Sequence, residues 1–416
     1  MNRRMLMGGA AAVVVAGGAY YLLRKDGATT VSSSSSAKKY DDGATDKEIK
    51  IGHTGPYSGP ASSYGAIGKC IEAYWKSVND AGGINGRQVK FVTLDDGYSP
   101  PKMVELVRQL VEQEKVLCTF NTLGTPTNTA IHKYMNQKKV PMLFVATGAS
   151  KWGNPKEFPW TMGFQPDYHT EGAIYAKHIL ANVKDPKIAV LMQNDDYGKD
   201  YYEGFKEGLG KDAGKIVKHV TFEVTDPTVD SQIIQLKDSG ANVFFNIATP
   251  KAAAQAIRKA GDLGWKPAHY LNNVSASVGS VMKPAGFDNS QGIITAQYLM
   301  DPTDKQWENT DDMKKWRAWM NKWMPGANQA DANYVFGFAV ATLMHETLRK
   351  CGDTLTRDNV MKQAANHQKY KMPMLIPGIT INTSPTDYYP IQAVKLAKFE
   401  GETWAPFGDI MAAEST

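Results

Sequence analysis

Short apolar runs alternate with amphipathic segments along most of this chain, from residue 49 to about residue 297. Runs such as "KIAVLM" and "NVFFNI" have the length and composition of buried strands, and the segments between them repeat apolar residues at helical spacing. Parallel strands need connections of this kind, and such connections are right-handed. The alternation therefore predicts an α/β fold built on doubly wound parallel sheets.

The predicted elements fall into two series, as expected for a chain of 416 residues that is too long for one ordinary core. The first series has strands "KEIKIG", "VKFVTLDD", "VLCTF" and "VPMLFVA". After Gln165 a second series begins, with helices over 169–182, 198–210, 229–239 and 251–262. A Trp-rich helix, a long helix and a β-rich tail from Ile379 follow. We therefore expect two lobes, each with its own sheet.

The N-terminus predicts export. "MNRR" precedes 19 residues without a charge, Met5 to Leu23, and "RKDG" ends the run. Residues 1–25 are therefore expected to be an export signal, twin-arginine-like or general secretory, or else an uncleaved membrane anchor. The Ser-rich residues 26–48 cannot bury enough apolar surface to fold and are expected to be a flexible tether.

Charge and cysteine content exclude several classes. The formal net charge of +5 is not gathered into a basic stripe, so we expect no nucleic-acid partner. Cys70, Cys118 and Cys351 are far apart, without a Cys-x-x-Cys pair, and we expect buried or free thiols, with one disulfide as the alternative. Because "HETLR" lacks the second histidine of a zinc helix, no metal or other cofactor is expected.

The stretch "IGHTGPYSGPASSYG", residues 51–65, lies between the first strand and the first helix. It has neither of the phosphate-binding glycine patterns, and Ser58 stands one residue late for a nucleophile turn. Asp95 and Asp96 end a strand and are expected to cap the following turn. No catalytic residue is assigned, and the protein is expected not to be an enzyme.

Taken in order, several motifs resemble the leucine/isoleucine/valine-type periplasmic binding proteins, which are receptors of ABC importers. The resemblance runs from about Ile49 to Asp409 and rests on "GPYSGPASSYG", "NDAGGINGR", "LGTPTN", "FVATGAS" and "NDDYGKDYYEGFKEGL". It implies two α/β lobes joined by three crossovers near residues 165, 297 and 377, with a ligand held between them. Lobe 1 would comprise residues 49–165 plus 298–377, and lobe 2 residues 166–297 plus 378–416.

The resemblance also implies ligand contacts at the carboxyl ends of the strands. Loops 123–128 and 147–150 match those that hold a carboxylate in the family, and tyrosines match those that cover the ligand. The alternative for the hydroxyl residues Thr125 and Ser150 is a helix cap. The implied ligand-binding residues are Tyr64, Gly124, Thr125, Ala149, Ser150, Tyr168, Tyr197, Thr249 and Asn273.

One departure bears on the ligand. Amino-acid binders of this family place an acid after the strand matching "HYLN", but this chain has "NNVSAS" there. Burying an ammonium without a carboxylate costs on the order of several kcal/mol, so Asp167 or Glu171 would have to replace that acid. The open alternatives are a branched-chain-amino-acid-like ligand and a small carboxylate without an ammonium, aromatic in view of Tyr64, Tyr168 and Tyr197.

These observations predict an extracytoplasmic or periplasmic solute-binding protein that captures a small organic ligand and delivers it to an ABC permease. It is expected to be a monomer, and a membrane tether through its N-terminus is one of the alternatives above. The competing hypothesis is a sensory module that signals to a membrane partner. An amide or ester hydrolase is the third hypothesis, and no nucleophile motif supports it.

Overall fold

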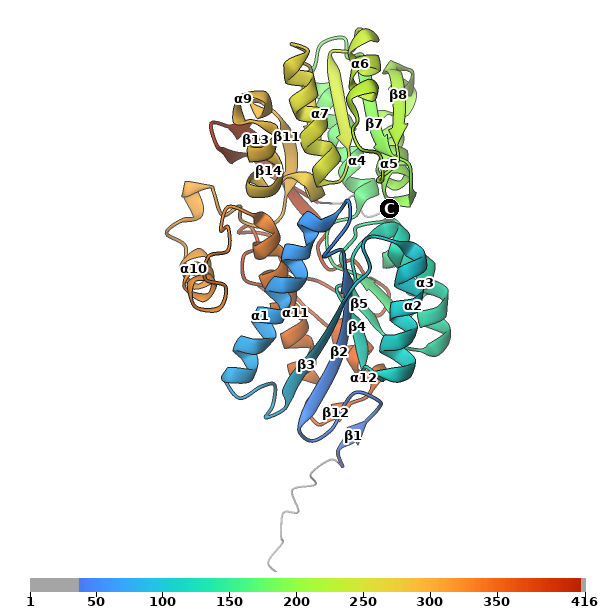
Figure 1. Ribbon diagram of the computed structural model, residues 1–416, viewed down its shortest axis with the longest axis vertical. Helices are drawn as coiled ribbons and strands as arrows, with labels where there is room; N and C mark the ends of the chain where they lie inside the picture. The colour runs from blue at the N-terminus through green and yellow to red at the C-terminus, as the bar shows by residue number, and fades with distance from the viewer. Residues whose placement is uncertain (1–36, 413–416) are drawn as a thin grey trace, which may run out of the picture. The chain divides into compact units, whose positions relative to one another are not determined.

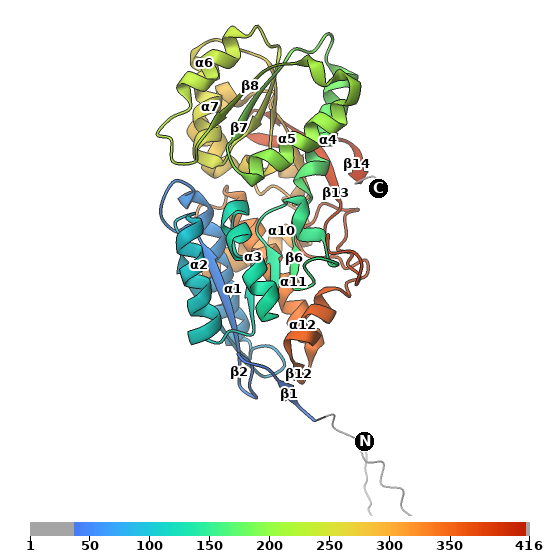
Figure 2. The same cartoon turned by 90° about the vertical axis from the view of Figure 1, so that its right-hand side faces the viewer.

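The computed structural model describes residues 37–412, and residues 38–412 belong to one compact unit. This unit contains two large sheets, each covered by helices on both faces (Figures 1 and 2). The predicted α/β fold with two doubly wound lobes is therefore confirmed. The proposed export segment, residues 1–25, lies outside the described residues.

Lobe 1 is built on a five-stranded sheet in the order β3-β2-β4-β5-β6, in which every neighbouring pair is parallel. Its strands are β2 (Glu48–Gly55), β3 (Gln88–Asp95), β4 (Cys118–Phe120), β5 (Met142–Val145) and β6 (Thr161–Gly163). Its helices are α1 (Gly65–Asp80), α2 (Pro100–Arg108), α3 (Thr125–Lys138), α10 (Asp311–Trp323), α11 (Ala332–Cys351) and α12 (Arg357–Ala364). Helices α2 and α3 cover one face of the sheet, α1, α11 and α12 lie on the opposite face, and α10 packs outside them against α1.

Lobe 2 is built on a seven-stranded sheet in the order β14-β13-β11-β10-β9-β7-β8. Its strands are β7 (Ile188–Gln193), β8 (Ile216–Phe222), β9 (Val243–Ile247), β10 (Ala268–Leu271), β11 (Ile294–Gln297), β13 (Ala393–Glu400) and β14 (Thr403–Ala412). Its helices are α4 (Tyr168–Asn182), α5 (Asp196–Leu209), α6 (Asp230–Asp238), α7 (Pro250–Asp262), α8 (Lys283–Ala285) and α9 (Phe287–Ser290). Strands β13 and β14 are antiparallel and close one edge of the sheet.

Two interior strands of lobe 2, β7 and β9, are buried along their whole length. Such continuous apolar runs are typical of parallel strands covered on both faces. Helices α4 and α5 pack on one face, and α6, α7 and α8 on the other. The core on the α4 side continues into lobe 1, where it includes residues of α2 and α3.

The chain passes between the lobes three times: between β6 and α4, between β11 and α10, and between α12 and β13. The first two passages include the predicted positions near residues 165 and 297. The side chains of Ile379, Ile381 and Ile391 pack in the core of lobe 1, and the predicted β-rich tail forms strands only from Ala393. We therefore propose that lobe 1 extends to about residue 392 instead of 377.

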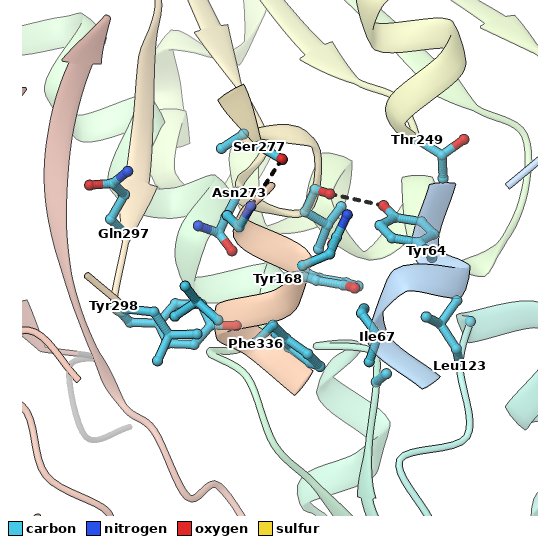
Figure 3. Close-up of a pocket in the computed structure, with 18 of the residues that line it drawn as sticks. Tyr64, Ile67, Leu123, Tyr168, Thr249, Asn273, Ser277, Gln297, Tyr298 and Phe336 are labelled. Carbon is cyan, nitrogen blue, oxygen red and sulfur yellow. Dashed lines mark hydrogen bonds between the residues drawn. The ribbon is translucent and has the colours of Figure 1, made fainter. Parts of the chain in front are cut away.

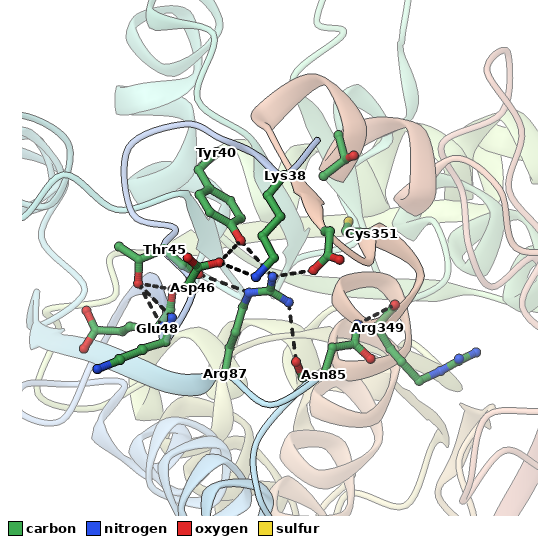
Figure 4. Close-up of polar contacts among 12 residues, drawn as sticks. Lys38, Tyr40, Thr45, Asp46, Glu48, Asn85, Arg87, Arg349 and Cys351 are labelled. Atoms are coloured by element: carbon green, nitrogen blue, oxygen red, sulfur yellow. Dashed lines mark hydrogen bonds and ion pairs between the residues drawn. The ribbon is translucent and has the colours of Figure 1, made fainter. Parts of the chain in front are cut away.

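Residues 38–48 are packed against lobe 1, which corrects the predicted flexible tether over this range. Strand β1 (Lys39–Tyr40) pairs with β12 (Thr354–Leu355). The buried guanidinium of Arg87 binds the Tyr40 hydroxyl at 2.9 Å, the Thr45 carbonyl oxygen at 3.1 Å and the Asp353 carboxylate at 2.6 Å (Figure 4). The Ser-rich composition concealed this contact because the partners that fix the segment lie far away in the sequence.

Two further features of the sequence, the Trp-rich helix and the three cysteines, can be located in the fold. In the Trp-rich helix α10, Trp316 and Met320 are fully buried in the lobe 1 core, and Trp319 donates to Ser77 Oγ at 3.0 Å, so this side of the helix packs within lobe 1. Cys70, Cys118 and Cys351 are buried free thiols. None of the helices within residues 37–412 has the length and apolar character needed to cross a membrane.

Candidate functional site

A cavity lies between the two lobes (Figure 3). Its walls come from the loops that follow the carboxyl ends of parallel strands, where open α/β sheets bind ligands. Lobe 1 contributes residues after β2, β3, β4 and β5, and lobe 2 contributes residues after β7, β9, β10 and β11. In this order they include Tyr64, Tyr98, Thr125, Ala146, Tyr197, Thr249, Asn273 and Tyr298.

Most of the predicted contact residues come together around this cavity. Its lining includes Tyr64, Gly124, Thr125, Tyr168, Tyr197, Thr249 and Asn273. Their role in binding stays a prediction, but their convergence from segments up to about 200 residues apart supports it.

Ala149 and Ser150 do not line the cavity. Ala149 is buried in the core that connects the lobes, and Ser150 binds Asp200 of α5, through its main-chain N–H at 3.0 Å and its hydroxyl at 2.7 Å. The loop after β5 instead presents Ala146 to the cavity, and the hydroxyl of Thr147 lies 2.6 Å from that of Thr125. The sequence-based assignment was therefore too far along the loop.

Five tyrosines give the cavity its aromatic walls: Tyr64, Tyr98, Tyr168, Tyr197 and Tyr298. Tyr168 and Tyr197 pack edge to face with their ring centroids 5.6 Å apart. Burial raises the pKa of each of the five phenols above its usual value, so all remain neutral near pH 7. The walls therefore suit a ligand with an apolar or aromatic body.

Sequence reasoning missed Tyr98, which lines the cavity beside Gly124. Its φ of 62° is in the left-handed region, which is unfavourable for a bulky side chain. The main-chain N–H of Tyr98 donates to the Asp96 carboxylate at 2.8 Å, so Asp96 holds the turn as expected for a cap. Strained residues persist where the surrounding structure fixes them, often at functional sites.

Helix N-termini provide the positive partial charge around the cavity. Among the described residues, no lysine or arginine lines it. Helices α3, α7 and α11 begin at the cavity, with Gly124, Thr249 and Asp331 as their first flanking residues. N-terminal N–H groups favour anions, and the hydroxyl of Thr125 adds a polar group at the start of α3. This arrangement can hold a carboxylate without a basic side chain.

One carboxylate does line the cavity, and it is neither of those expected from the sequence. Asp167 and Glu171 border a separate groove. Asp301, in the second passage between the lobes, lines the cavity and accepts hydrogen bonds from the main-chain N–H and hydroxyl of Thr303 through Oδ1. Burial raises the pKa of Asp301 to about 6. It lies four residues after the end of β11, in the kind of position where open α/β sheets bind ligands.

The lobes contact each other on several sides of the cavity. Tyr64 donates from lobe 1 to the Val274 carbonyl oxygen of lobe 2 at 2.9 Å, and Ser277 of lobe 2 donates to Asp331 of lobe 1 at 2.8 Å. Elsewhere, Ser150 binds Asp200, as described above. The structure is therefore a closed arrangement of the lobes. Within residues 37–412, no cluster of three or more His, Cys, Asp or Glu side chains could hold a metal ion.

Two α/β lobes, three connecting passages and a cavity lined by strand ends define a class of receptor that closes around a small molecule. A sequence model described as periplasmic binding protein matches residues 48–403. The chain therefore belongs to the periplasmic binding protein family, and the resemblance stated from the sequence is confirmed.

The relatives and structural neighbours are named as solute-binding proteins. A Leu/Ile/Val-binding protein homologue of Brucella suis is 27% identical over 251 residues, which is 58% of this chain and 66% of that protein, just under two thirds of its length. A Thermus thermophilus branched-chain amino acid ABC transporter structure with bound valine has a TM-score of 0.80 at 16% identity, covering 88% of this chain and 97% of that one.

A second solved structure carries a different ligand. It is a solute-binding protein of an ABC transporter from Rhodopseudomonas palustris, in complex with 3,4-dihydroxybenzoic acid. Its TM-score is 0.74 at 19% identity, and the alignment covers 88% of this chain and 98% of that one. The two neighbours share the fold of this chain and bind chemically different molecules, so the fold does not specify the ligand.

Proposed function

We propose that this protein is the extracytoplasmic receptor of an ABC importer, and that it captures a small organic carboxylate by closure of its two lobes. The observation that carries the proposal is the cavity between the lobes, lined by both of them and bordered by hydrogen bonds that connect them. Closure around a solute is the use to which this geometry is best suited.

The chemistry of the cavity supports a carboxylate with an apolar or aromatic body. Helix N-termini and the Thr125 hydroxyl suit the carboxylate, and the tyrosine walls suit the body. The loop after β10 offers the uncharged Asn273 instead of an acid. A branched-chain amino acid would have to place its ammonium near Asp301 instead. Because the loop after β10 offers no negative charge, we favour a ligand without an ammonium.

The partner and location follow from the same proposal. An ABC permease would receive the solute, and the receptor would act outside the cytoplasm after export through its N-terminal segment, whether cleaved or kept as an anchor. We propose a monomer, because the cavity is complete within one chain.

A thermal-shift screen followed by calorimetry tests the proposal. Aromatic and aliphatic monocarboxylates, amino acids and amides would be added to the purified protein. We expect monocarboxylates to raise the unfolding midpoint, because a ligand that binds only the native state stabilises it. If amino acids or amides bind and no monocarboxylate does, the ligand class is wrong, and if no solute binds, the receptor proposal fails.

A matched pair of variants tests the place of binding. Ala146 lines the cavity, whereas Ala181 lies exposed near the end of α4. Ala146→Leu should fill part of the cavity and weaken the ligand at least tenfold, while Ala181→Leu should leave the affinity unchanged. Equal affinities in the two variants would place the ligand elsewhere.

A further inference from the structure

The side chain of Asn273 is fixed so that it presents an uncharged acceptor to the cavity. Its amide nitrogen donates to the main-chain carbonyl of Ala296 on β11, which identifies the remaining amide atom as Oδ1. Figure 3 shows this oxygen directed toward the space beside Tyr168 and Tyr298. The main-chain N–H of Asn273 donates to Glu171 Oε1 at 2.8 Å, which holds the loop from behind.

Tyr298 adds a hydroxyl to the same end of the cavity. It follows Ala296 by two residues, so the hydrogen bond between Asn273 and Ala296 places the two side chains at the same strand end. The ring of Tyr298 packs edge to face with Phe164, with centroids 6.5 Å apart. Within the described part of the chain, neither the Tyr298 hydroxyl nor Asn273 Oδ1 takes part in a hydrogen bond, and Asn273 is half-buried while Tyr298 is 4% exposed, so both oxygens are free to face a ligand.

A polar group that faces a binding cavity without a protein partner can be paired by the ligand, and a site that offers such a pair discriminates against analogues that lack the matching group. An acceptor beside a hydroxyl is complementary to a group that donates one hydrogen bond and can accept another. A ligand hydroxyl meets both requirements. A charged ammonium would bring a desolvation cost that Asn273, being neutral, offsets poorly.

We propose that Asn273 and Tyr298 are specificity-determining residues that select an organic acid carrying an uncharged hydrogen-bond donor, a hydroxyl group, at the end away from its carboxylate. This inference rests on the proposed function, because it assumes that the carboxylate lies at the start of α3. It narrows the ligand class from small carboxylates to hydroxylated ones.

The test compares acids that differ only in this group. Calorimetry on the purified protein would use benzoate and its 3- and 4-hydroxy, methoxy and aminomethyl derivatives, together with pentanoate and 5-hydroxypentanoate. A hydroxyl should improve affinity about tenfold over the parent acid in at least one position, as expected for one well-placed hydrogen bond. Methoxy groups, which accept but do not donate, should give no such gain.

Variants assign the effect to the two residues. Tyr298→Phe removes only a hydroxyl without a protein partner, so it should fold normally and lose most of the hydroxyl advantage, measured as the ratio of the affinities for a hydroxylated acid and its parent acid. Asn273→Asp should shift the preference toward the aminomethyl acids. Tyr388→Phe is the matched control: Tyr388 is a buried tyrosine outside the cavity, and the ratios should not change.

The outcomes separate this inference from the proposed function. If none of these acids binds, the proposed ligand class is wrong, and the inference about the hydroxyl group fails with it. If they bind but a hydroxyl gives no advantage, or if the aminomethyl acids bind best because Asp301 pairs with the ammonium, the inference is overturned and the receptor function stands. An unchanged hydroxyl advantage in Tyr298→Phe, or an unchanged preference between hydroxyl and aminomethyl acids in Asn273→Asp, would also overturn it.

Discussion

Glu171 lies behind the cavity wall and supports it. Its carboxylate accepts hydrogen bonds from the Tyr175 hydroxyl at 2.7 Å, the Tyr201 hydroxyl at 2.9 Å and the Asn273 main-chain N–H at 2.8 Å. Burial nevertheless raises its pKa from 4.5 to about 7, because the desolvation of the charge outweighs these donors. The carboxyl group that holds the main chain of Asn273 therefore changes its charge as the pH passes through about 7.

The pKa of Glu171 gives a prediction for stability. A carboxyl group whose pKa is higher in the folded state than in the unfolded state binds protons more tightly when folded. Its contribution to the free energy of unfolding therefore falls as pH rises from 4.5 to about 7, and is constant above that. At about 1.4 kcal/mol per pH unit, the change is on the order of 3 kcal/mol.

Urea unfolding of the wild type and Glu171→Gln between pH 4.5 and 7.5 measures this contribution. The variant, which cannot ionise, should lack it, so that the wild type loses stability relative to Glu171→Gln as pH rises. Buried histidines such as His53, whose pKa burial lowers to about 4, act in the opposite direction but contribute equally to both proteins. Parallel stability curves would contradict the assignment.

At the scale of the element, the start of α3 depends on a glycine. Gly124 has a φ of +101°, and a Cβ added there would lie 2.6 Å from Thr127 Oγ1 and 2.7 Å from Tyr98 Cε2. The turn into α3 therefore needs both the conformation of glycine and its lack of a side chain. The same turn places Thr125 at the cavity.

Gly82 provides a control for this turn, because its φ is +103° but an added Cβ would meet no atom within 4 Å. Both Gly124→Ala and Gly82→Ala carry the backbone penalty. Only Gly124→Ala adds the steric clash, so we expect it to be less stable than Gly82→Ala by about 1–3 kcal/mol and to bind ligand more weakly. Urea unfolding and calorimetry measure both quantities, and equal losses would show that the clash is relieved without consequence.

The elements differed in how far the sequence predicted them. Helices α4 and α7 begin within one residue of their predicted ranges, 169–182 and 251–262, and end where predicted, because helical spacing is a local pattern. The two-residue strands β1 and β12 have no local pattern of their own. Their pairing depends on distant partners such as Arg87.

The cavity-lining residues that were predicted lie in segments that follow strands. Those that were missed lie where the path of a loop or passage decides which side chains face the cavity. Tyr64 and Tyr197 lie in the segments after β2 and β7 that the family resemblance matched, and both line the cavity. Ser150 was misplaced because the path of the loop after β5 is set by contacts such as that between Thr147 and Thr125. Asp301 and Tyr298 lie in a passage between the lobes, where sequence spacing does not indicate which side chains turn inward.

At the scale of the whole molecule, contacts outside the cavity contribute to closure. Asp200 of α5 receives both the main-chain N–H and the hydroxyl of Ser150 from the other lobe, and Lys151 pairs with Asp196 at 2.8 Å nearby. Neither Ser150 nor Asp200 lines the cavity. These contacts can stabilise the closed arrangement without touching the ligand.

Asp200→Ala therefore should weaken ligand binding about threefold to tenfold, mainly through faster dissociation, because it removes two hydrogen bonds specific to the closed state. The stability of the ligand-free protein should change little. Glu207→Ala is the control, since Glu207 lies on the same helix and pairs with His169 within lobe 2 at 2.8 Å. Stopped-flow dissociation rates that are equal in the two variants would argue against a role in closure.

The attachment of residues 38–48 to lobe 1 has a mechanical consequence. Strand β1 joins lobe 1 at the end remote from lobe 2 (Figures 1 and 2), and Arg87 fastens it there. A force applied to the chain ahead of Lys38 would therefore enter the fold through lobe 1. It would not act directly on the contacts between the two lobes. Closing of the two lobes around a ligand would thus be independent of an attachment at this end of the chain.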